Sequence, residues 1–138
     1  MLSKAGDEVT VVTGIPNYPD GKIPKGYGYF KRRRENVDNV NVIRLWLIPR
    51  GSGSKLRMIL NYMSYFTSTL FYSLYLALFK KRYDVIFVHH TSPLFITISP
   101  IIYKWIRKPK MILWDLDLWP DTLVAMDIVK SKRLILFL

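Results

Sequence analysis

Three aspartates lie close together in the last third of the chain, where a carboxylate could act as a general base. Asp115 ends the apolar run KMILWD, which is typical of a strand buried on both faces, and Asp117 and Asp121 follow it. In open α/β sheets the carboxyl ends of the strands line the ligand crevice, and a carboxylate placed there can take a proton from a hydroxyl group. Alternatively, Asp117 or Asp121 caps the helix expected to follow, and Pro120 suits the first turn of that helix.

Two more groups of polar residues follow predicted strands. Asn17 and Tyr18, in the segment Gly14–Lys22, could hydrogen-bond to a sugar and stack on it, although the same residues are ordinary in turns. His89 and Ser92 follow another strand, and imidazole and hydroxyl groups at a helix N-terminus could hold a phosphate. The alternative for the histidine is the polar end of a strand. Both groups are therefore candidates for a binding site. The alternative for each is a purely structural role, in a turn or at the end of a strand.

The elements that would position these residues alternate between strands and helices. Strands are predicted at Glu8–Thr13, Val42–Ile48, Asp84–Val88 and Lys110–Asp115. Helices are predicted at Lys55–Phe79, at Leu94–Ile106 with a bend at Pro100, and at Asp121–Val129, with a long loop over Gly14–Asn41. Alternation of buried strands with helices indicates an α/β fold, a Rossmann-like parallel sheet with flanking helices over residues 1–138.

Composition points to an anionic partner and excludes several kinds of site. The 138 residues carry a formal net charge of +11 and include no cysteine, which excludes disulfides, thiolate nucleophiles and cysteine-based zinc sites. Basic clusters interleaved with apolar helices suit an anionic bilayer better than nucleic acid, for which the sequence carries no binding motif. A solvated basic face is the alternative. The clusters are Lys31–Arg34, Lys80–Arg82, Arg107–Lys110 and Lys130–Arg133.

The predicted helix Lys55–Phe79 is the most apolar stretch of the chain. From Ile59 to Phe79 it contains no charged residue, and its length alone would allow a transmembrane helix. Asn61, Ser64 and four further serine or threonine residues interrupt the apolar sequence, however. They favour a helix that packs on a sheet and touches lipid with one side. We therefore expect peripheral contact with a membrane.

Three segments together carry a family resemblance. Val9–Tyr18 with Pro19 (VTVVTGIPNYP), Asp84–Phe95 (DVIFVHHTSPLF) and Trp114–Leu123 (WDLDLWPDTL) resemble the N-terminal, acceptor-side domain of family-four GT-B glycosyltransferases. The sequence is most similar to the capsular, colanic-acid and O-antigen sugar transferases, including those like the L-fucosamine transferases. The resemblance covers the chain from about Leu2 to Val129.

The resemblance implies transfer of a sugar from a nucleotide-sugar donor to a polyprenyl-diphosphate-linked acceptor, without a metal or other cofactor, at the cytoplasmic face of the plasma membrane. Asp117 matches the aspartate of the family's DLWP segment and becomes the candidate base. The implied acceptor-binding residues are Asn17, Tyr18, His89, Ser92, Trp119 and Asp121.

The resemblance also implies that parts of the enzyme are absent from this chain. Family members begin with a strand that here has no counterpart, and in a sheet of order 3-2-1-4-5 that strand is the middle one. The nucleotide-sugar domain carries two glutamates eight positions apart, whereas this chain contains Glu8 and Glu35 alone. We therefore expect a glycosyltransferase fragment, inactive alone. The alternative is a non-catalytic subunit that recruits a separate donor-binding chain to the membrane.

Overall fold

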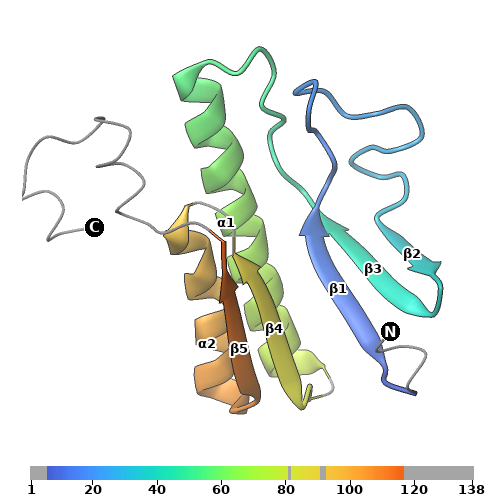
Figure 1. The fold of residues 1–138 in the computed structure, drawn as a ribbon, viewed down its shortest axis with the longest axis vertical. Helices are drawn as coiled ribbons and strands as arrows, with labels where there is room; N and C mark the ends of the chain where they lie inside the picture. Colours follow the sequence, from blue (N-terminus) through green and yellow to red (C-terminus); the bar gives the residue numbers. More distant parts are fainter. Residues whose placement is uncertain (1–5, 81, 91–92, 117–138) are drawn as a thin grey trace, which may run out of the picture. The chain divides into compact units, whose positions relative to one another are not determined.

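The computed structural model describes residues 6–80, 82–90 and 93–116 of the chain. Within these residues the fold is mixed α/β, as the sequence predicts at that level, and Figure 1 shows the order of the elements. Contacts between residues divide the chain into two compact units, Met1–Phe71 and Tyr72–Leu138. The long helix α1 (Lys55–Phe79) begins in the first unit and ends in the second.

The sheet of the first unit combines a parallel pair of strands with a hairpin. β1 (Val9–Gly14) pairs in parallel with β3 (Val40–Leu45), and β2 (Arg34–Val37) pairs antiparallel with β3, giving the order β1-β3-β2. Asp38 and Asn39 join β2 to β3 with φ angles of 51° and 63°. Positive φ at both positions is what the tight two-residue turn of a hairpin requires, and Asp and Asn tolerate it better than most residues.

The strand β2 corrects the prediction of one long loop over residues 14–41. Its sequence, Arg-Glu-Asn-Val, lacks the alternation of apolar and polar residues that identifies a strand. The strand forms because β3 provides a partner. Arg44 of β3 donates from Nη1 to the carbonyl of Arg32 at 3.0 Å and forms an ion pair with Glu35 at 2.5 Å. Tertiary pairing therefore decides the structure here, rather than local preference.

The second unit contains a parallel pair of strands and the helical segment between them. β4 (Val85–His90) pairs in parallel with β5 (Lys110–Asp115), and η2 (Leu94–Thr97), a short 3₁₀ helix, leads into α2 (Ile98–Arg107). The bounds predicted for β5 are confirmed. The helix type changes at Ile98 rather than at the predicted bend, Pro100, which lies in the first turn of α2 where a proline is tolerated. Instead of the one predicted sheet, the described strands form two.

Each unit has a small buried core. In the first unit Ile15, Leu45 and Leu47 are 2%, 4% and 5% exposed, and all three lie at or just beyond the carboxyl ends of β1 and β3. In the second unit Ala77 and Tyr103 are buried. The best-packed part of the first unit is therefore the end of the sheet from which the loops emerge.

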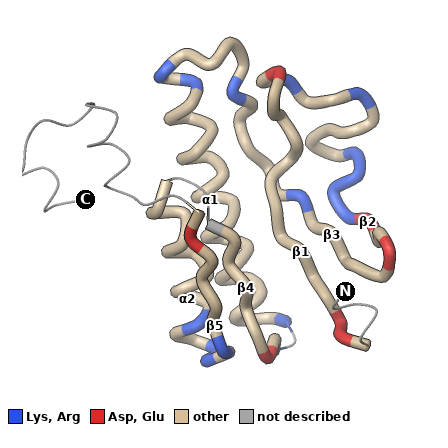
Figure 2. Tube along the Cα trace, in the orientation of Figure 1, with Lys and Arg blue, Asp and Glu red and all other residues tan. Residues whose placement is uncertain are grey.

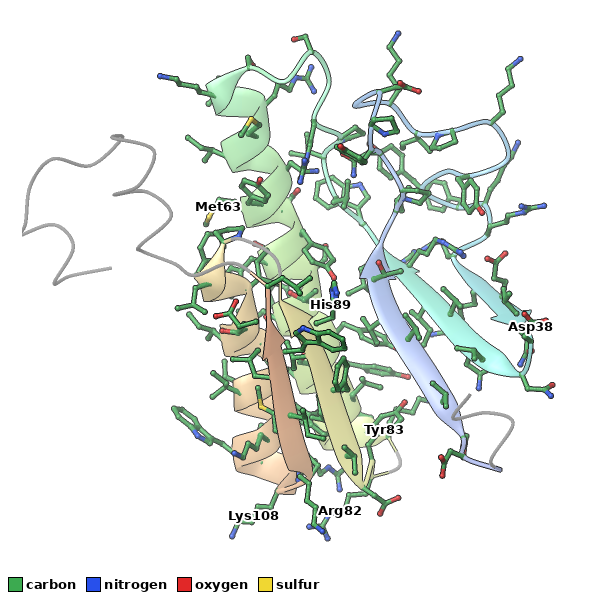
Figure 3. All side chains as sticks on the ribbon, viewed as in Figure 1. Asp38, Met63, Arg82, Tyr83, His89 and Lys108 are labelled. Atoms are coloured by element: carbon green, nitrogen blue, oxygen red, sulfur yellow. The ribbon has the colours of Figure 1, made fainter. Side chains whose placement is uncertain are left out.

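The helix α1 has the predicted bounds but an unusual distribution of side chains. Polar Asn61 and Ser64 are buried, whereas Leu56, Ile59 and Met63 are 67%, 57% and 46% exposed. Met63 is labelled in Figure 3. Among the described residues, no helix is long and apolar enough to cross a membrane. The side of α1 that faces the protein is thus the more polar one in its first half.

Two arginines of the second unit cap the ends of its helices. Arg107, at the end of α2, donates from Nε to the carbonyl of Ala77 and from Nη2 to that of Lys80 at 3.1 Å, at the end of α1. Arg82, which follows α1, donates from Nε to the carbonyl of Arg107 at 2.9 Å. Arg82 and Lys108 lie at the same end of this unit in Figure 3. Cations at helix C-termini satisfy free carbonyls and oppose the helix dipole.

Arg107→Ala should destabilise the protein by about 1–2 kcal/mol, because it removes both capping bonds at the end of α1. Urea unfolding followed by circular dichroism measures this loss. Lys104→Ala, an exposed change in the same last turn of α2, is the matched control and should stay within about 0.5 kcal/mol of the wild type. Equal stabilities of the two variants would show that the capping contributes nothing.

Candidate functional site

The parallel pairing of β1 with β3 brings two loops together at one edge of the first sheet. The register runs from Val9 opposite Val40 to Gly14 opposite Leu45, so both strands end at the same place. The backbone N–H of Ile15 donates to the carbonyl of Leu45 at 3.1 Å and extends the pairing by one residue. We call the segments that follow, residues 14–22 and 49–54, the paired loops. Loops at the carboxyl ends of parallel strands are the usual ligand-binding position in α/β sheets.

A close backbone contact fastens the paired loops to each other. The N–H of Gly51 donates to the carbonyl of Gly21 at 2.8 Å. Gly21 has a φ of 67°, and a Cβ at this position would lie 1.9 Å from the Gly51 carbonyl oxygen. Only glycine therefore allows the two backbones to approach this closely.

Asn17, a residue predicted to bind the acceptor, joins the same two loops. Its Nδ2 donates to the carbonyl of Ile15 at 3.2 Å, and its Oδ1 accepts a hydrogen bond from the N–H of Arg50 at 3.3 Å. The side chain thus holds the first loop in shape and ties it to the second. Tyr18, the next predicted residue, is 78% exposed. Asn17 therefore positions the loops, and the side chain of Tyr18 projects into solvent beside it.

Arg50 is the fixed cation of the paired loops. Its Nε donates to Oδ1 of Asn61 at 3.4 Å, and its guanidinium group lies 5.4 Å from the centre of the Tyr62 ring. A hydrogen bond and a cation–π contact together restrict a long side chain that would otherwise sample many rotamers. Planar guanidinium groups held in this way are well suited to phosphate oxygens.

The buried polar residues of α1 hold Ile48, the residue that precedes the second loop. Asn61 donates from Nδ2 to the carbonyl of Ile48 at 2.6 Å, and Ser64 Oγ accepts from the N–H of Ile48 at 2.8 Å. Ser64 in turn donates to the carbonyl of Asn61 at 2.9 Å. Both backbone groups of one residue are therefore satisfied by side chains of the helix, which explains why polar residues occupy the protein-facing side of α1.

Sequence reasoning did not identify Arg50 or its supports. Arg50 lies in a segment, PRGSGS, that the predicted strands and helices leave out, and Asn61 and Ser64 were noted only as interruptions of an apolar helix. The available signal was their combination. An arginine just past a strand is followed by a helix whose polar residues lie three positions apart, as they would if both faced the same loop.

Basic side chains outnumber acidic ones at this end of the first unit, and several of these positions are blue in Figure 2. Lys22, Lys55 and Arg57, in or next to the paired loops, have exposed side chains. Arg50 is a further cation of these loops, and Asp20 is an acidic residue of the first loop. The first turn of α1 contains no acidic residue, so the positive end of the helix dipole adds to these charges. The paired loops therefore present a positive surface suited to an anion.

Tyr65 of α1 supports the base of the first loop. A Cβ at Gly14 would lie 2.5 Å from Cδ2 of Leu47 and 3.3 Å from Cε2 of Tyr65, so the Tyr65 ring packs directly against the end of β1. Burial raises the pKa of the Tyr65 hydroxyl, because the phenolate would be poorly solvated there.

The second unit places His89 at the end of β4, beside β5. His89 is opposite Trp114 in the parallel register, and their ring centres are 6.2 Å apart. Phe87 meets the same indole edge to face at 5.9 Å. His90 is opposite Asp115 in the same register. Both histidines belong to β4, which extends two residues past the predicted strand end at Val88. His89 is labelled in Figure 3.

The other predicted site residues lie outside the described residues. They are Ser92, Asp117, Trp119 and Asp121. Across residues 6–80, 82–90 and 93–116, no group of three or more histidine, aspartate or glutamate side chains could hold a metal ion. The described part of the candidate site consequently rests on the paired loops.

Gly21→Ala should lower the free energy of unfolding by about 2–4 kcal/mol, because it combines an unfavourable positive φ with a clash against Gly51. Gly26→Ala is a matched control, since Gly26 has a φ of 88° but nothing within 4 Å of an added Cβ. It should cost only about 1–2 kcal/mol. Chemical denaturation of the two variants compares them, and equal losses would mean that the loop contact is not a constraint.

Tyr65 predicts a loss of stability at alkaline pH. The ordinary pKa of 10.0 applies to the unfolded chain, and the folded value is higher. Above pH 10 the unfolded state therefore releases its proton first, and the free energy of unfolding falls as pH rises. Urea unfolding at neutral pH and just above pH 10 measures this change. The free energy of unfolding should fall less between the two pH values for Tyr65→Phe than for the wild type or Tyr18→Phe. Identical falls in all three proteins would contradict this.

We compared the chain with protein-family models, curated proteins and solved structures. The chain matches no protein-family model, no curated protein and no solved structure. The chemistry assigned to the paired loops therefore depends on Arg50, its supports and the surrounding charge.

Proposed function

We propose that the chain is the acceptor-side part of a Rossmann-like, GT-B glycosyltransferase that acts at the cytoplasmic face of a membrane in polysaccharide synthesis. The sugar would come from a nucleotide-sugar held by a separate donor-binding domain, and the acceptor would be linked to a polyprenyl diphosphate. In this proposal the paired loops hold the acceptor diphosphate, and the sugar end of the acceptor extends towards Tyr18.

The observation that carries the proposal is the fixed position of Arg50 in the second of two interlocked loops. The loops follow parallel strands, where α/β folds bind ligands. Asn17 accepts from the Arg50 backbone, and Asn61 accepts from its side chain. A cation restrained by both backbone and side-chain bonds loses less entropy on binding a diphosphate than a free one. Lys22 and Arg57 supply further positive charge nearby in sequence.

The proposed reaction needs one base. Asp117 would take the proton of the acceptor hydroxyl as its oxygen forms a bond to the anomeric carbon of the donor. The bond from that carbon to the nucleoside diphosphate breaks at the same time, and the leaving group departs with the electron pair. Asp117 follows β5 closely, and Asp115 is the last residue of that strand.

The exposed side of α1 supports membrane association and also the alternative function. Leu56, Ile59 and Met63 recur at helical spacing and are exposed, and such a stripe next to basic residues favours an interfacial position. The same feature would serve a non-catalytic subunit that recruits a donor-binding chain. The two functions can be distinguished at the paired loops, because the recruiting subunit has no need to bind a diphosphate there.

Arg50→Gln should weaken binding of a polyprenyl diphosphate by about 10- to 100-fold, the effect of losing one charge-assisted hydrogen bond. Isothermal titration of the full chain with geranylgeranyl diphosphate in neutral detergent micelles measures this. Arg50→Lys keeps the charge and should recover part of the affinity, because the planar fork is lost but the cation remains.

Lys104→Gln removes the same charge from an exposed position in α2 and is the matched control. It should bind the diphosphate as the wild type does. If Arg50→Gln and Lys104→Gln bind equally, the loops do not hold the diphosphate, and the recruiting function is favoured. Thermal denaturation of each variant checks that the fold is retained.

A further inference from the structure

The segment of residues 29–34, Tyr-Phe-Lys-Arg-Arg-Arg, combines an exposed aromatic residue with a continuous basic run. Phe30 is 93% exposed, the largest exposure among the large apolar side chains described. The four basic residues that follow are also exposed. Figure 2 shows them as an unbroken blue segment leading into β2. We call residues 29–34 the aromatic–basic segment. Neither the paired loops nor the proposed reaction uses it.

The sheet holds the basic run in a defined conformation. The N–H of Arg44, on β3, donates to the carbonyl of Arg33 at 2.8 Å, and its Nη1 donates to the carbonyl of Arg32 at 3.0 Å. The Arg32 guanidinium lies 5.5 Å from the Tyr27 ring centre, and that of Arg44 lies 5.0 Å from the same ring. The run is therefore presented by a scaffold.

The acidic residue nearest in sequence does not neutralise the run. Glu35 forms its ion pair with Arg44 at 2.5 Å, so its charge is matched by a residue outside residues 31–34. Because Arg44 neutralises Glu35, the positive charges of residues 31–34 are not cancelled by this carboxylate. An exposed run with this net charge is suited to an anionic partner.

Trp46 of the first unit packs against Tyr29 and adds another aromatic ring beside the aromatic–basic segment. Tyr29 and Trp46 have ring centres 6.2 Å apart and are 37% and 44% exposed. Tyrosine and tryptophan prefer the boundary between water and acyl chains, and an exposed phenylalanine gains from entering the apolar layer. Phe30 would reach the apolar layer while residues 31–34 remain among the headgroups.

We propose that the aromatic–basic segment is an electrostatic anchor for an anionic lipid bilayer, with Phe30 inserted and residues 31–34 at the headgroups. The inference rests on the membrane association proposed above and names its charge-dependent contact. Charge complementarity selects anionic lipid. Single-stranded nucleic acid would need aromatic faces spaced for successive bases, whereas Tyr29 and Trp46 are in contact with each other.

The test is co-sedimentation of the full chain with sucrose-loaded vesicles, either pure phosphatidylcholine or about one third phosphatidylglycerol. The triple variant Lys31→Gln, Arg33→Gln, Arg34→Gln should bind the anionic vesicles about 100-fold more weakly, since each basic residue contributes about fivefold. The matched control, Lys104→Gln with Lys108→Gln and Lys110→Gln, removes the same charge from exposed positions of the second unit. It should lose less than about tenfold.

Phe30→Ser should weaken binding to anionic vesicles about tenfold, as expected for one aromatic side chain. Phe30→Trp should keep binding, and its additional fluorescence should be quenched by brominated lipids. Equal losses for the two triple variants would overturn the proposal, because net charge would then explain binding. Absence of quenching at position 30, or retention of the chain by single-stranded RNA but not by anionic vesicles, would also overturn it.

The vesicles contain no polyprenyl diphosphate, and the micelles of the acceptor assay contain no anionic lipid. Failure of the anchor therefore leaves the acceptor-binding result intact. Failure of acceptor binding likewise leaves the vesicle result to be judged by itself.

Discussion

The parallel pairing of β1 with β3 is the constraint on which the first unit depends. It places the ends of two strands at one edge, where Ile15 and Leu45 are buried together. Everything proposed for the paired loops follows from this edge, because the loops have no regular structure to define their separation. Backbone contact at Gly21 and Gly51 and the bridging side chain of Asn17 then convert proximity into a fixed arrangement. The result is a preorganised surface, which lowers the entropic cost of binding.

The helix α1 presents polar side chains to the protein and apolar side chains on its outer side. A loop that lies against a helix needs partners for its backbone N–H and carbonyl groups, and buried groups without partners are costly. Asn61 and Ser64 supply those partners to Ile48. Polar residues therefore take the inner side, and Leu56 and Ile59 are left on the outside. In the proposed function this outer side meets lipid, which suits its exposed apolar side chains.

Local patterns predicted the long elements well and the contacts between segments poorly. The bounds of α1 and β5 could be predicted because mainly apolar runs without internal charge lie between charged or turn-forming residues. β2 could not, because its polar sequence becomes a strand only beside β3. The positions of Asn17 and Tyr18 after β1 were predicted, but the bridging role of Asn17 depends on Arg50, a residue 33 positions away. Sequence spacing contains no information about such a partner until the register of β1 and β3 is known.

The net charge of the chain hides two kinds of basic residue. Arg107 and Arg82 direct their guanidinium groups at helix carbonyls, and Arg44 is committed to Glu35 and the backbone of the basic run. These residues stabilise the fold, and their charge is largely compensated locally by carbonyls, helix dipoles or a carboxylate. Residues 31–34 have exposed side chains instead. A partner surface responds to the second kind alone, so counting charges overestimates the positive surface available to it. The arginines that bond inward and the basic run that faces outward are both needed, since Arg44 is what holds that run in place.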